Sequence, residues 1–147
     1  SSVFLVPKSV AKHMVKRKKG SIVNIASDVG IISPDHRIYE PNKKFNYKGV
    51  NFNTPISYSV AKSGIISMTR YLATYWAKKG IRVNCISPAG VYKKHNKKFV
   101  EQLSQRIPIG RMAKSYELNG AIIYLCSNAS SFVTGHNLVV DGGRTIW

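Results

Sequence analysis

The sequence predicts an α/β fold in which helices cover a parallel β-sheet. Helical and strand-like segments alternate along the whole chain, an order that is typical of parallel sheets. The strand-like segments are short apolar runs, as expected of strands that are buried on both faces. The chain has 147 residues, of which 44% are hydrophobic and 20% are charged. This length and composition suit one globular domain.

The N-terminal part is expected to contain one helix, one strand and one long loop. An amphipathic pattern over 2–19 predicts a helix that Pro7 should strain and Gly20 should end. The apolar run 21–27 predicts the first buried strand. Residues 28–55 contain three prolines and several asparagines and lysines, so we expect them to form a loop.

A second helix is expected over 56–79, because its apolar residues recur on one stripe. The stripe contains Ile65, Met68, Leu72 and Trp76. Gly80 is expected to end this helix. The remaining elements, in order, are a strand over 81–87, a short helix over 97–107, a helix over 115–128 and a strand over 137–143. Ser115 should act as the N-cap of the helix that it begins.

The strong positive charge indicates an anionic partner or has a purely structural origin. The chain carries 23 basic and 6 acidic residues, which gives a net charge of +17. Such an excess suits nucleic acid, an acidic carrier protein or a phosphorylated substrate. Basic clusters at 16–20 and 77–80 precede a glycine and suit helix ends. The cluster at 93–98 lacks that explanation and is the better candidate for contacting an anion. No basic stretch is interleaved with aromatic residues, so nucleic acid is not the partner that we expect.

The cysteine and hydropathy patterns exclude several other classes. Cys85 and Cys126 belong to no metal-binding pattern, so we expect two reduced thiols in a cytoplasmic protein and no metal. No apolar run approaches the roughly 20 residues that span a bilayer, and no secretory signal is present, so we expect no membrane association.

Three Tyr–Lys pairs share a four-residue spacing, which places both side chains on one face of a helix. They are Tyr39 with Lys43, Tyr58 with Lys62, and Tyr75 with Lys79. A phenol beside an ammonium group can act as an acid–base catalyst, but the spacing alone more often means a half-buried tyrosine beside an exposed lysine. Pro41 lies inside the first pair and disfavours a helix there.

Position along the helix separates the other two pairs. Ligands of open parallel sheets bind beyond the carboxyl ends of the strands, where each following helix begins. Tyr58 lies in the first turn of its helix, whereas Tyr75 lies about 25 Å further along it at 1.5 Å per residue. Ser27 and the loop 88–91 follow the first two strands at the same edge. We therefore expect Ser27, Tyr58, Lys62 and this loop to converge.

Five motifs resemble, in order and spacing, the second half of the short-chain dehydrogenase/reductase family. They are GSIVNIAS, YSVAKSG, IRVNCISPAGV, PIGRMA and LCSNASSFVTGHNLVVDGG. The resemblance implies a Rossmann-like doubly wound parallel sheet, truncated at the N-terminus, with 1–147 forming a single partial domain. It also implies a cytoplasmic homodimer or homotetramer that interconverts an alcohol and a ketone with NAD or NADP. The small-molecule substrate would be a sugar or a 3-oxoacyl thioester. The four-residue spacing of Tyr58 and Lys62 argues against the related enoyl reductases.

The resemblance also implies a role for each matching residue. Tyr58 would be the general acid/base at the substrate oxygen. Lys62 would favour the phenolate and hold the nicotinamide ribose, so both residues would also contact the cofactor. Ser27 would donate a hydrogen bond to the substrate oxygen. The nicotinamide pocket would be lined by Pro88, Ala89, Gly90 and Val91.

Two departures from the family pattern carry their own expectations. Residues 33–55 are longer than is usual there, and we expect an inserted loop over the substrate side that sets specificity. The chain lacks the glycine-rich phosphate turn, so this chain alone is expected to be inactive and to bind dinucleotides weakly. The alternative hypothesis is a non-catalytic basic binding module, or an inactive fragment, that interacts with an acidic partner.

Overall fold

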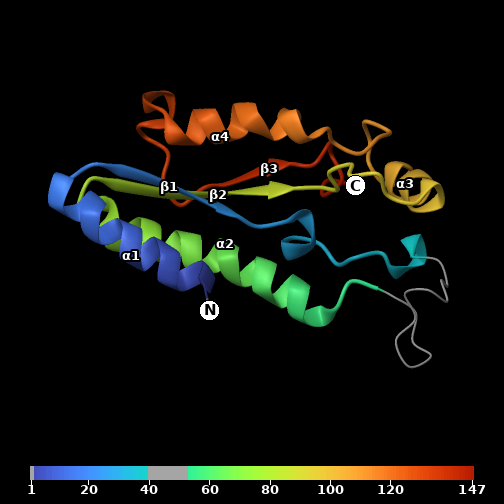
Figure 1. Ribbon diagram of the computed structural model, residues 1–147, viewed down its shortest axis with the longest axis horizontal. Helices are drawn as coiled ribbons and strands as arrows, with labels where there is room; N and C mark the ends of the chain where they lie inside the picture. Colours follow the sequence, from blue (N-terminus) through green and yellow to red (C-terminus); the bar gives the residue numbers. More distant parts are fainter. Residues whose placement is uncertain (1, 40–52) are drawn as a thin grey trace.

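A computed structural model describes residues 2–39 and 53–147, and it contains a parallel sheet flanked by helices on both faces (Figure 1). Within these residues the sheet has three strands in the order β1 (Gly20–Ile25), β2 (Ile81–Pro88) and β3 (Asn137–Val140). The helices α1 (Ser2–Arg17) and α2 (Ile56–Ala77) cover one face, and α4 (Asn119–Cys126) covers the other. The α/β class and the parallel sheet are therefore confirmed.

Both strand pairings are parallel, so the carboxyl ends of all three strands lie at one edge. Gly20 pairs with Ile81 at the start of β1, and Ile25 pairs with Ile86 near its end. The backbone N–H of Ala26 continues this ladder by donating to the Ile86 carbonyl at 2.8 Å. The residues that follow β1 and β2 therefore emerge side by side.

Helix α2 packs its apolar stripe onto the sheet, as the sequence predicts. Ile65, Leu72 and Trp76 are buried, while Met68 is partly buried against the same core. Across this interface Asn24 Nδ2 of β1 donates to Thr69 Oγ1 of α2 at 3.0 Å. Because this buried hydrogen bond satisfies both side chains, it fixes the position of α2 on β1 without leaving an unpaired polar group.

Helix α1 differs from the sequence prediction at its C-terminal end. Pro7 lies inside the helix, beyond its first turn, where its missing N–H removes one backbone hydrogen bond. The helix ends at Arg17 rather than at Gly20, which begins β1. Lys18 adopts the left-handed conformation, with φ 48°, and donates its N–H to the Val15 carbonyl in place of the expected glycine stop.

The predicted glycine stop after α2 is confirmed. Gly80 has φ 73°, and a Cβ placed there would lie 2.1 Å from the Lys18 carbonyl oxygen. Its own carbonyl accepts a hydrogen bond from the N–H of Gly20 at 3.2 Å. Gly80 therefore lets the chain turn from α2 into β2 while touching the end of α1.

The C-terminal helices are shorter than predicted, with α3 (Lys97–Ser104) ending at Ser104 and α4 (Asn119–Cys126) ending at Cys126. Helix α3 begins after Asn96, whose side chain accepts the Lys98 N–H at 2.9 Å. The prediction that Ser115 is an N-cap is wrong. Ser115 begins a 3₁₀ turn, η4 (Ser115–Leu118), whose start is fixed by Glu117 accepting the N–H of Lys114 at 2.7 Å. This turn leads directly into α4.

The strand ends also move by a few residues. β1 ends at Ile25, two residues before the predicted end at Ser27, because the chain turns into the 3₁₀ turn η1 (Asp28–Gly30). β2 extends to Pro88. β3 ends at Val140, because Gly142 and Gly143 adopt positive φ angles of 66° and 89°.

Three further expectations can be compared with the described part of the chain. Cys85 and Cys126 are free thiols, as predicted. Residues 2–39 and 53–147 contain no group of three or more histidine, cysteine or acidic residues that could hold a metal ion. No helix in those two ranges has both the length and the apolar character needed to cross a membrane.

Candidate functional site

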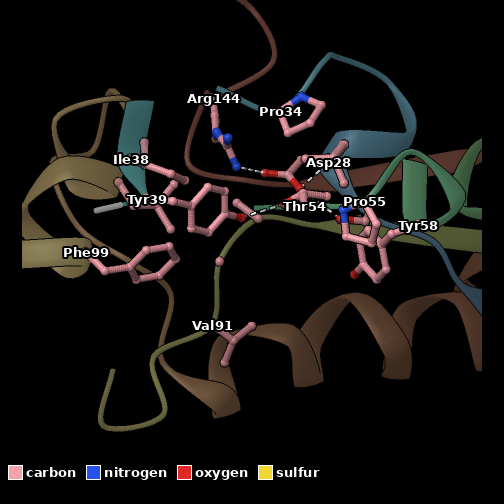
Figure 2. Close-up of a pocket in the computed structure, with 15 residues that line it drawn as sticks. Asp28, Pro34, Ile38, Tyr39, Thr54, Pro55, Tyr58, Val91, Phe99 and Arg144 are labelled. Atoms are coloured by element: carbon pink, nitrogen blue, oxygen red, sulfur yellow. Dashed lines mark hydrogen bonds and ion pairs between the residues drawn. The ribbon is translucent and has the colours of Figure 1, made fainter. Parts of the chain in front are cut away.

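A pocket of about 380 Å³ opens at the carboxyl edge of the sheet (Figure 2). It lies between the turn after β1, the start of α2, the loop after β2 and the helix α3. Its wall is formed by Ser27, Asp28, Val29, Pro34, Ile38, Tyr39, Thr54, Pro55, Tyr58, Ala89, Gly90, Val91, Phe99, Leu103 and Arg144. The site is mostly apolar with a few polar groups, which is the usual composition of a small-molecule pocket.

The pocket brings together most of the residues that the sequence singles out. Ser27 and Tyr58 both line it, although Ser27 is buried and Tyr58 is 44% exposed. Of the loop after β2, Ala89, Gly90 and Val91 line the same pocket. Among the residues that the structure describes, Lys62 and Pro88 are not part of the pocket wall.

Lys62 lies behind Tyr58 and ties the start of α2 to β1. Its Nζ lies 5.5 Å from the centroid of the Tyr58 ring and donates to the Ile25 carbonyl at 3.0 Å. The neighbouring Ser63 Oγ donates to the Gly30 carbonyl at 2.9 Å. These two bonds fix the first turns of α2 against the turn after β1. The ammonium charge is therefore held close to the phenol ring.

The loop after β2 presses closely against α3. A Cβ at Gly90 would lie 2.5 Å from Leu103 Cδ2 and 3.0 Å from Met112 Cε. The Gly90 carbonyl accepts the N–H of Ala113 at 3.0 Å, and Val91 forms a bridge with the same residue. Glycine is thus needed at position 90 for steric reasons, and the loop forms a fixed wall of the pocket.

A buried ion pair in the same pocket was not found by sequence reasoning. Arg144 Nη1 donates to Asp28 Oδ2, and both side chains are almost completely buried. Asp28 Oδ1 accepts two further hydrogen bonds, from Ser27 Oγ at 2.9 Å and from the Val29 N–H at 2.8 Å. The only available signal was that Asp28 directly follows Ser27. Arg144 lies 116 residues further along the chain, so no local pattern connects the two.

Tyr39 also lies in this pocket, which makes it a second phenol near Ser27. Its hydroxyl lies 2.5 Å from Thr54 Oγ1 in a hydrogen bond, and its ring stacks on Phe99 at 5.7 Å between centroids (Figure 2). Its backbone angles, φ −96° and ψ 117°, are extended rather than helical, as the sequence predicts. Lys43, which has the four-residue spacing from Tyr39, lies outside the described residues.

The described ends of the segment 33–55 lie at the pocket. Pro34, Thr54 and Pro55 line it. Ile38 is buried in an apolar cluster with Leu103, Ile107 and Met112. Since 40–52 lie outside the described residues, the prediction that the whole segment is an inserted specificity loop is not tested.

Asp35 anchors this segment to the end of α3. Its carboxylate accepts hydrogen bonds from Arg37 Nε at 2.8 Å and from Arg106 Nε at 2.5 Å. Hydrogen bonds from Arg37 and then from Arg106 hold the pKa of Asp35 well below its ordinary value. The pocket wall formed by Ile38 and α3 is therefore held in place by charge as well as by packing.

The comparisons with known proteins agree with this architecture. A protein-family model described as Enoyl-(Acyl carrier protein) reductase matches residues 1–145. A short-chain dehydrogenase from Leptospira borgpetersenii, solved with bound NAD⁺, superposes with a TM-score of 0.86 at 38% identity. That match covers 97% of this chain and 52% of the other. The chain belongs to the short-chain dehydrogenase/reductase family.

Two further members of the family illustrate its range. A gluconate 5-dehydrogenase from Burkholderia cenocepacia, solved with NADP and tartrate, superposes with a TM-score of 0.79 at 32% identity, over 97% of this chain and 51% of the other. A 3-oxoacyl-(acyl-carrier-protein) reductase from Thermotoga maritima is 34% identical over 98% of this chain and 53% of its own length. The chain thus spans about half the length of these relatives, which share the Rossmann-type fold.

The second helical Tyr–Lys pair lies at the other end of α2. Lys79 Nζ lies 5.0 Å from the centroid of the Tyr75 ring, which also stacks on Tyr71. These residues line a cleft of about 740 Å³ between α1 and α2, together with Lys8, Ala11, Lys12, His13, Val15, Lys16, Leu72 and Trp76. Tyr75 is thus far from Ser27, as the position of the two pairs along the helix predicts.

The basic cluster 93–98 is exposed and partly explained by local structure. His95 Nδ1 accepts the N–H of Lys93 at 3.1 Å, and Asn96 caps α3. Lys97 Nζ lies 3.9 Å from Glu101 Oε1. The suggestion that this cluster contacts an anion stays a prediction.

Proposed function

We propose that this chain is the catalytic and substrate-binding part of an NAD- or NADP-dependent oxidoreductase that interconverts an alcohol and a ketone. The observation that carries the proposal is the meeting of Ser27 and Tyr58 in one pocket, with Lys62 directly behind Tyr58. Family membership and the cofactors bound in the relatives support it.

Tyr58 is the general acid/base of the proposed reaction. Its hydroxyl gives a proton to the carbonyl oxygen during reduction and takes one from the hydroxyl group during oxidation. An opposite charge close to a phenol favours its ionised form, and the Lys62 ammonium supplies such a charge. Lys62 is itself oriented by its bond to the Ile25 carbonyl, so its charge stays beside the ring.

Ser27 is the second hydrogen-bonding group for the reacting oxygen. It follows β1 at the edge where Tyr58 begins α2, so the two hydroxyl-bearing side chains enter the pocket from different elements. Two groups on one oxygen define its position better than one does, and positioning of this kind lowers the barrier to proton transfer.

The residues around the pocket fit a nicotinamide ring and its ribose. Ala89, Gly90 and Val91 offer a narrow wall of small side chains and backbone, which suits a flat ring. Lys62 and Tyr58 offer an ammonium and a hydroxyl, which suit ribose hydroxyls. When bound, the nicotinamide supplies or accepts the hydride. In the proposal Pro88, at the end of β2, holds this wall from outside the pocket.

The proposed substrate is a small polar alcohol or ketone, such as a sugar or a 3-oxoacyl thioester. A volume of about 380 Å³ is near the lower end for ligand pockets, so it favours a small molecule or the end of a longer one. The names of the gluconate and 3-oxoacyl relatives are compatible with either class. Ketone chemistry rather than enoyl reduction is favoured by the four-residue spacing of Tyr58 and Lys62.

Several properties of the whole protein belong to the same proposal. It is a cytoplasmic homodimer or homotetramer, and the segment 33–55 contributes to its substrate specificity. This chain alone is inactive, because dinucleotide affinity comes largely from a phosphate-binding turn that the 147 residues lack. The alternative, a basic module that binds an acidic partner, has no need for a buried serine and a tyrosine in one pocket.

A turnover assay on the whole protein that carries this chain tests the proposal. We expect NADH or NADPH to be consumed with a panel of small polar ketones. Ser27→Ala should lower turnover by about 10²–10³-fold, the usual loss for one hydrogen-bond donor at a reacting oxygen. The matched control is Ser9→Ala, which removes an exposed serine of α1 that does not line the pocket. Turnover that survives Ser27→Ala unchanged would contradict the proposal.

A further inference from the structure

We propose that the basic cluster 93–98 binds the phosphate group of a phosphorylated substrate, so that the pocket takes a sugar phosphate. The cluster has the sequence KKHNKK and connects the loop after β2 to the start of α3. The inference rests on the proposed function, because it names the substrate class of the same pocket.

The cluster lies beside the pocket. The chain leaves the pocket wall at Val91 and returns to it at Phe99, in the first turn of α3 (Figure 2). The residues between these two are all exposed. A substrate that occupies the pocket therefore has the lysines of the cluster next to the wall that it touches.

The cluster is held in a defined conformation. The Tyr92 N–H donates to the Ala113 carbonyl at 2.9 Å, and the Lys93 N–H donates to His95 Nδ1 at 3.1 Å. The His95 ring lies 5.3 Å from the ring of Phe99, between centroids. A binding surface that is already ordered loses less conformational entropy when a ligand binds.

The donors of the cluster match a phosphate group. Lys93, Lys94 and Lys97 each carry an ammonium group, which binds phosphate as a point charge. Because His95 Nδ1 accepts a hydrogen bond, the proton of the neutral ring is on Nε2, which is a further donor. A phosphate monoester offers three oxygens and about two negative charges at neutral pH, whereas a carboxylate offers two oxygens and one charge.

The chain itself supplies these lysines with little negative charge. Five of its six acidic residues lie in the described ranges. Their partners are arginines for Asp28, Asp35 and Glu117, Lys97 at 3.9 Å for Glu101, and backbone N–H groups for Asp141. Within those ranges, Lys93 and Lys94 thus have no carboxylate partner. Neighbouring like charges repel one another, so an anionic group of the substrate would relieve this repulsion.

A small phosphorylated molecule fits the cluster better than an acidic protein does. A stable protein–protein interface takes about 20–30 residues on each side, whereas the cluster is one short segment. The pocket volume of about 380 Å³ also favours a small substrate. Of the substrates proposed above, a sugar that carries a phosphate therefore suits both the pocket and its neighbouring charges.

A binding experiment on the whole protein tests the inference. The probes are ribitol and D-ribitol 5-phosphate, two acyclic alcohols that differ only by the phosphate. Each is titrated by calorimetry into the protein saturated with the reduced cofactor, a combination that cannot transfer a hydride. We expect the phosphate ester to bind about tenfold more tightly or better. This preference should shrink as the NaCl concentration rises from about 50 mM to about 500 mM, because salt screens exposed charges. Equal binding of the two probes, or binding of neither, would overturn the inference.

Double variants locate the effect on the chain. Lys93→Gln with Lys94→Gln should bring the two dissociation constants within about threefold of each other. Lys93→Arg with Lys94→Arg should keep the preference, because arginine keeps the charge. The matched control, Lys16→Gln with Lys78→Gln, removes the same charge from exposed helix ends at the amino edge of the sheet and should leave the preference unchanged. Equal losses in the two glutamine variants would assign the preference to overall charge and contradict the inference.

A carrier-bound substrate would give a different result. A 3-oxoacyl thioester on an acidic carrier protein could be reduced with a KM that rises in the Lys93→Gln, Lys94→Gln variant while both ribitol probes bind equally. The cluster would then hold a protein partner, and the inference would be wrong. The proposed function is tested separately, because neither probe reacts. Unchanged turnover in Tyr58→Phe would contradict the proposed function whatever the probes show.

Discussion

Two Tyr–Lys pairs lie at the two ends of helix α2, with nearly the same local geometry and very different surroundings. Lys62 Nζ lies 5.5 Å from the Tyr58 ring centroid, and Lys79 Nζ lies 5.0 Å from that of Tyr75. Only the first pair begins the helix at the carboxyl edge of the sheet, beside Ser27. The second lies in the cleft between α1 and α2, among lysines and apolar core residues.

This difference shows that the four-residue spacing brings a tyrosine and a lysine together, whereas their position relative to the sheet determines what the pair can do. A phenol beside an ammonium needs a third group and a cavity before it can serve a reaction. Tyr58 has both, since Ser27 and the pocket adjoin it. Tyr75 instead covers the packing between α1 and α2, where Leu72 and Trp76 form the core. We therefore expect α2 to have a chemical end, around Tyr58, and a packing end, around Leu72 and Tyr75.

The largest expected effect is on turnover after loss of a lysine. Lys62→Met should lower turnover by about 10²–10⁴-fold, because acid–base catalysis by Tyr58 depends on the adjacent charge. Lys79→Met removes the matching ammonium at the other end of the helix and should leave turnover nearly unchanged. Steady-state kinetics of the two variants make the comparison. Equal losses would mean that the spacing, and not the position, decides the role.

The packing end should respond in stability and not in chemistry. Leu72 is 3% exposed in the core cluster with Trp76, so Leu72→Ala should cost about 2–5 kcal/mol of unfolding free energy. Turnover per folded molecule should stay the same. Val60→Ala, which shortens an exposed side chain of the same helix, should have little effect on stability. Denaturant unfolding, with activity measured on the folded fraction, checks both expectations. A large loss of turnover in folded Leu72→Ala would contradict the separation of a chemical end from a packing end.

The loop after β2, beside the chemical end of α2, should lose substrate affinity when a side chain is added at Gly90. At Gly90 a Cβ would overlap Leu103, so Gly90→Ala should strain the pocket wall by about 1–3 kcal/mol and raise KM by about tenfold. Gly64→Ala is the matched control on α2, because a Cβ there meets nothing within 4 Å. It should raise helix stability by about 0.5–1 kcal/mol without changing KM. A normal KM in Gly90→Ala would show that this loop does not shape the pocket.

The smallest effect concerns the charged anchor of the pocket wall. Because Arg37 and Arg106 lower the pKa of Asp35, its ionised form stabilises the folded state at neutral pH. This contribution is lost as the pH falls below the ordinary value of 3.8 and through the lower folded value. Asp35→Asn should therefore cost about 1 kcal/mol at pH 7 and progressively less below pH 3.8. Unfolding curves across this pH range, compared with wild type, test the sign, and a difference that grows with acidity would contradict it.

Much of the fold could be predicted from the sequence, because buried strands and amphipathic helices leave strong hydropathy patterns. The element order and the stripe of α2 follow from such patterns. The ends of elements do not, because they depend on contacts with distant residues. Gly20 pairs with Ile81 and so belongs to β1, while Lys18 adopts the left-handed conformation at the position where the sequence predicted a glycine.

The candidate site was predictable only where its residues follow strands or begin helices. Ser27, Tyr58 and the loop 88–91 are placed by the parallel order of the sheet, which a sequence can show. The pair of Asp28 and Arg144 joins residues from opposite ends of the chain, so it emerges only when the chain folds. Tyr39 reaches the pocket through an irregular segment whose path no periodicity predicts.

The most direct test of the central claim compares three phenols. In the whole protein, Tyr58→Phe should lose about 10²–10⁴-fold in turnover, the usual contribution of general acid–base catalysis. Tyr75→Phe removes the hydroxyl of the matching helical pair, and Tyr39→Phe removes the other phenol of the pocket, whose hydroxyl bonds Thr54. Both should keep nearly full turnover. A loss in Tyr39→Phe or Tyr75→Phe equal to that in Tyr58→Phe would contradict the account.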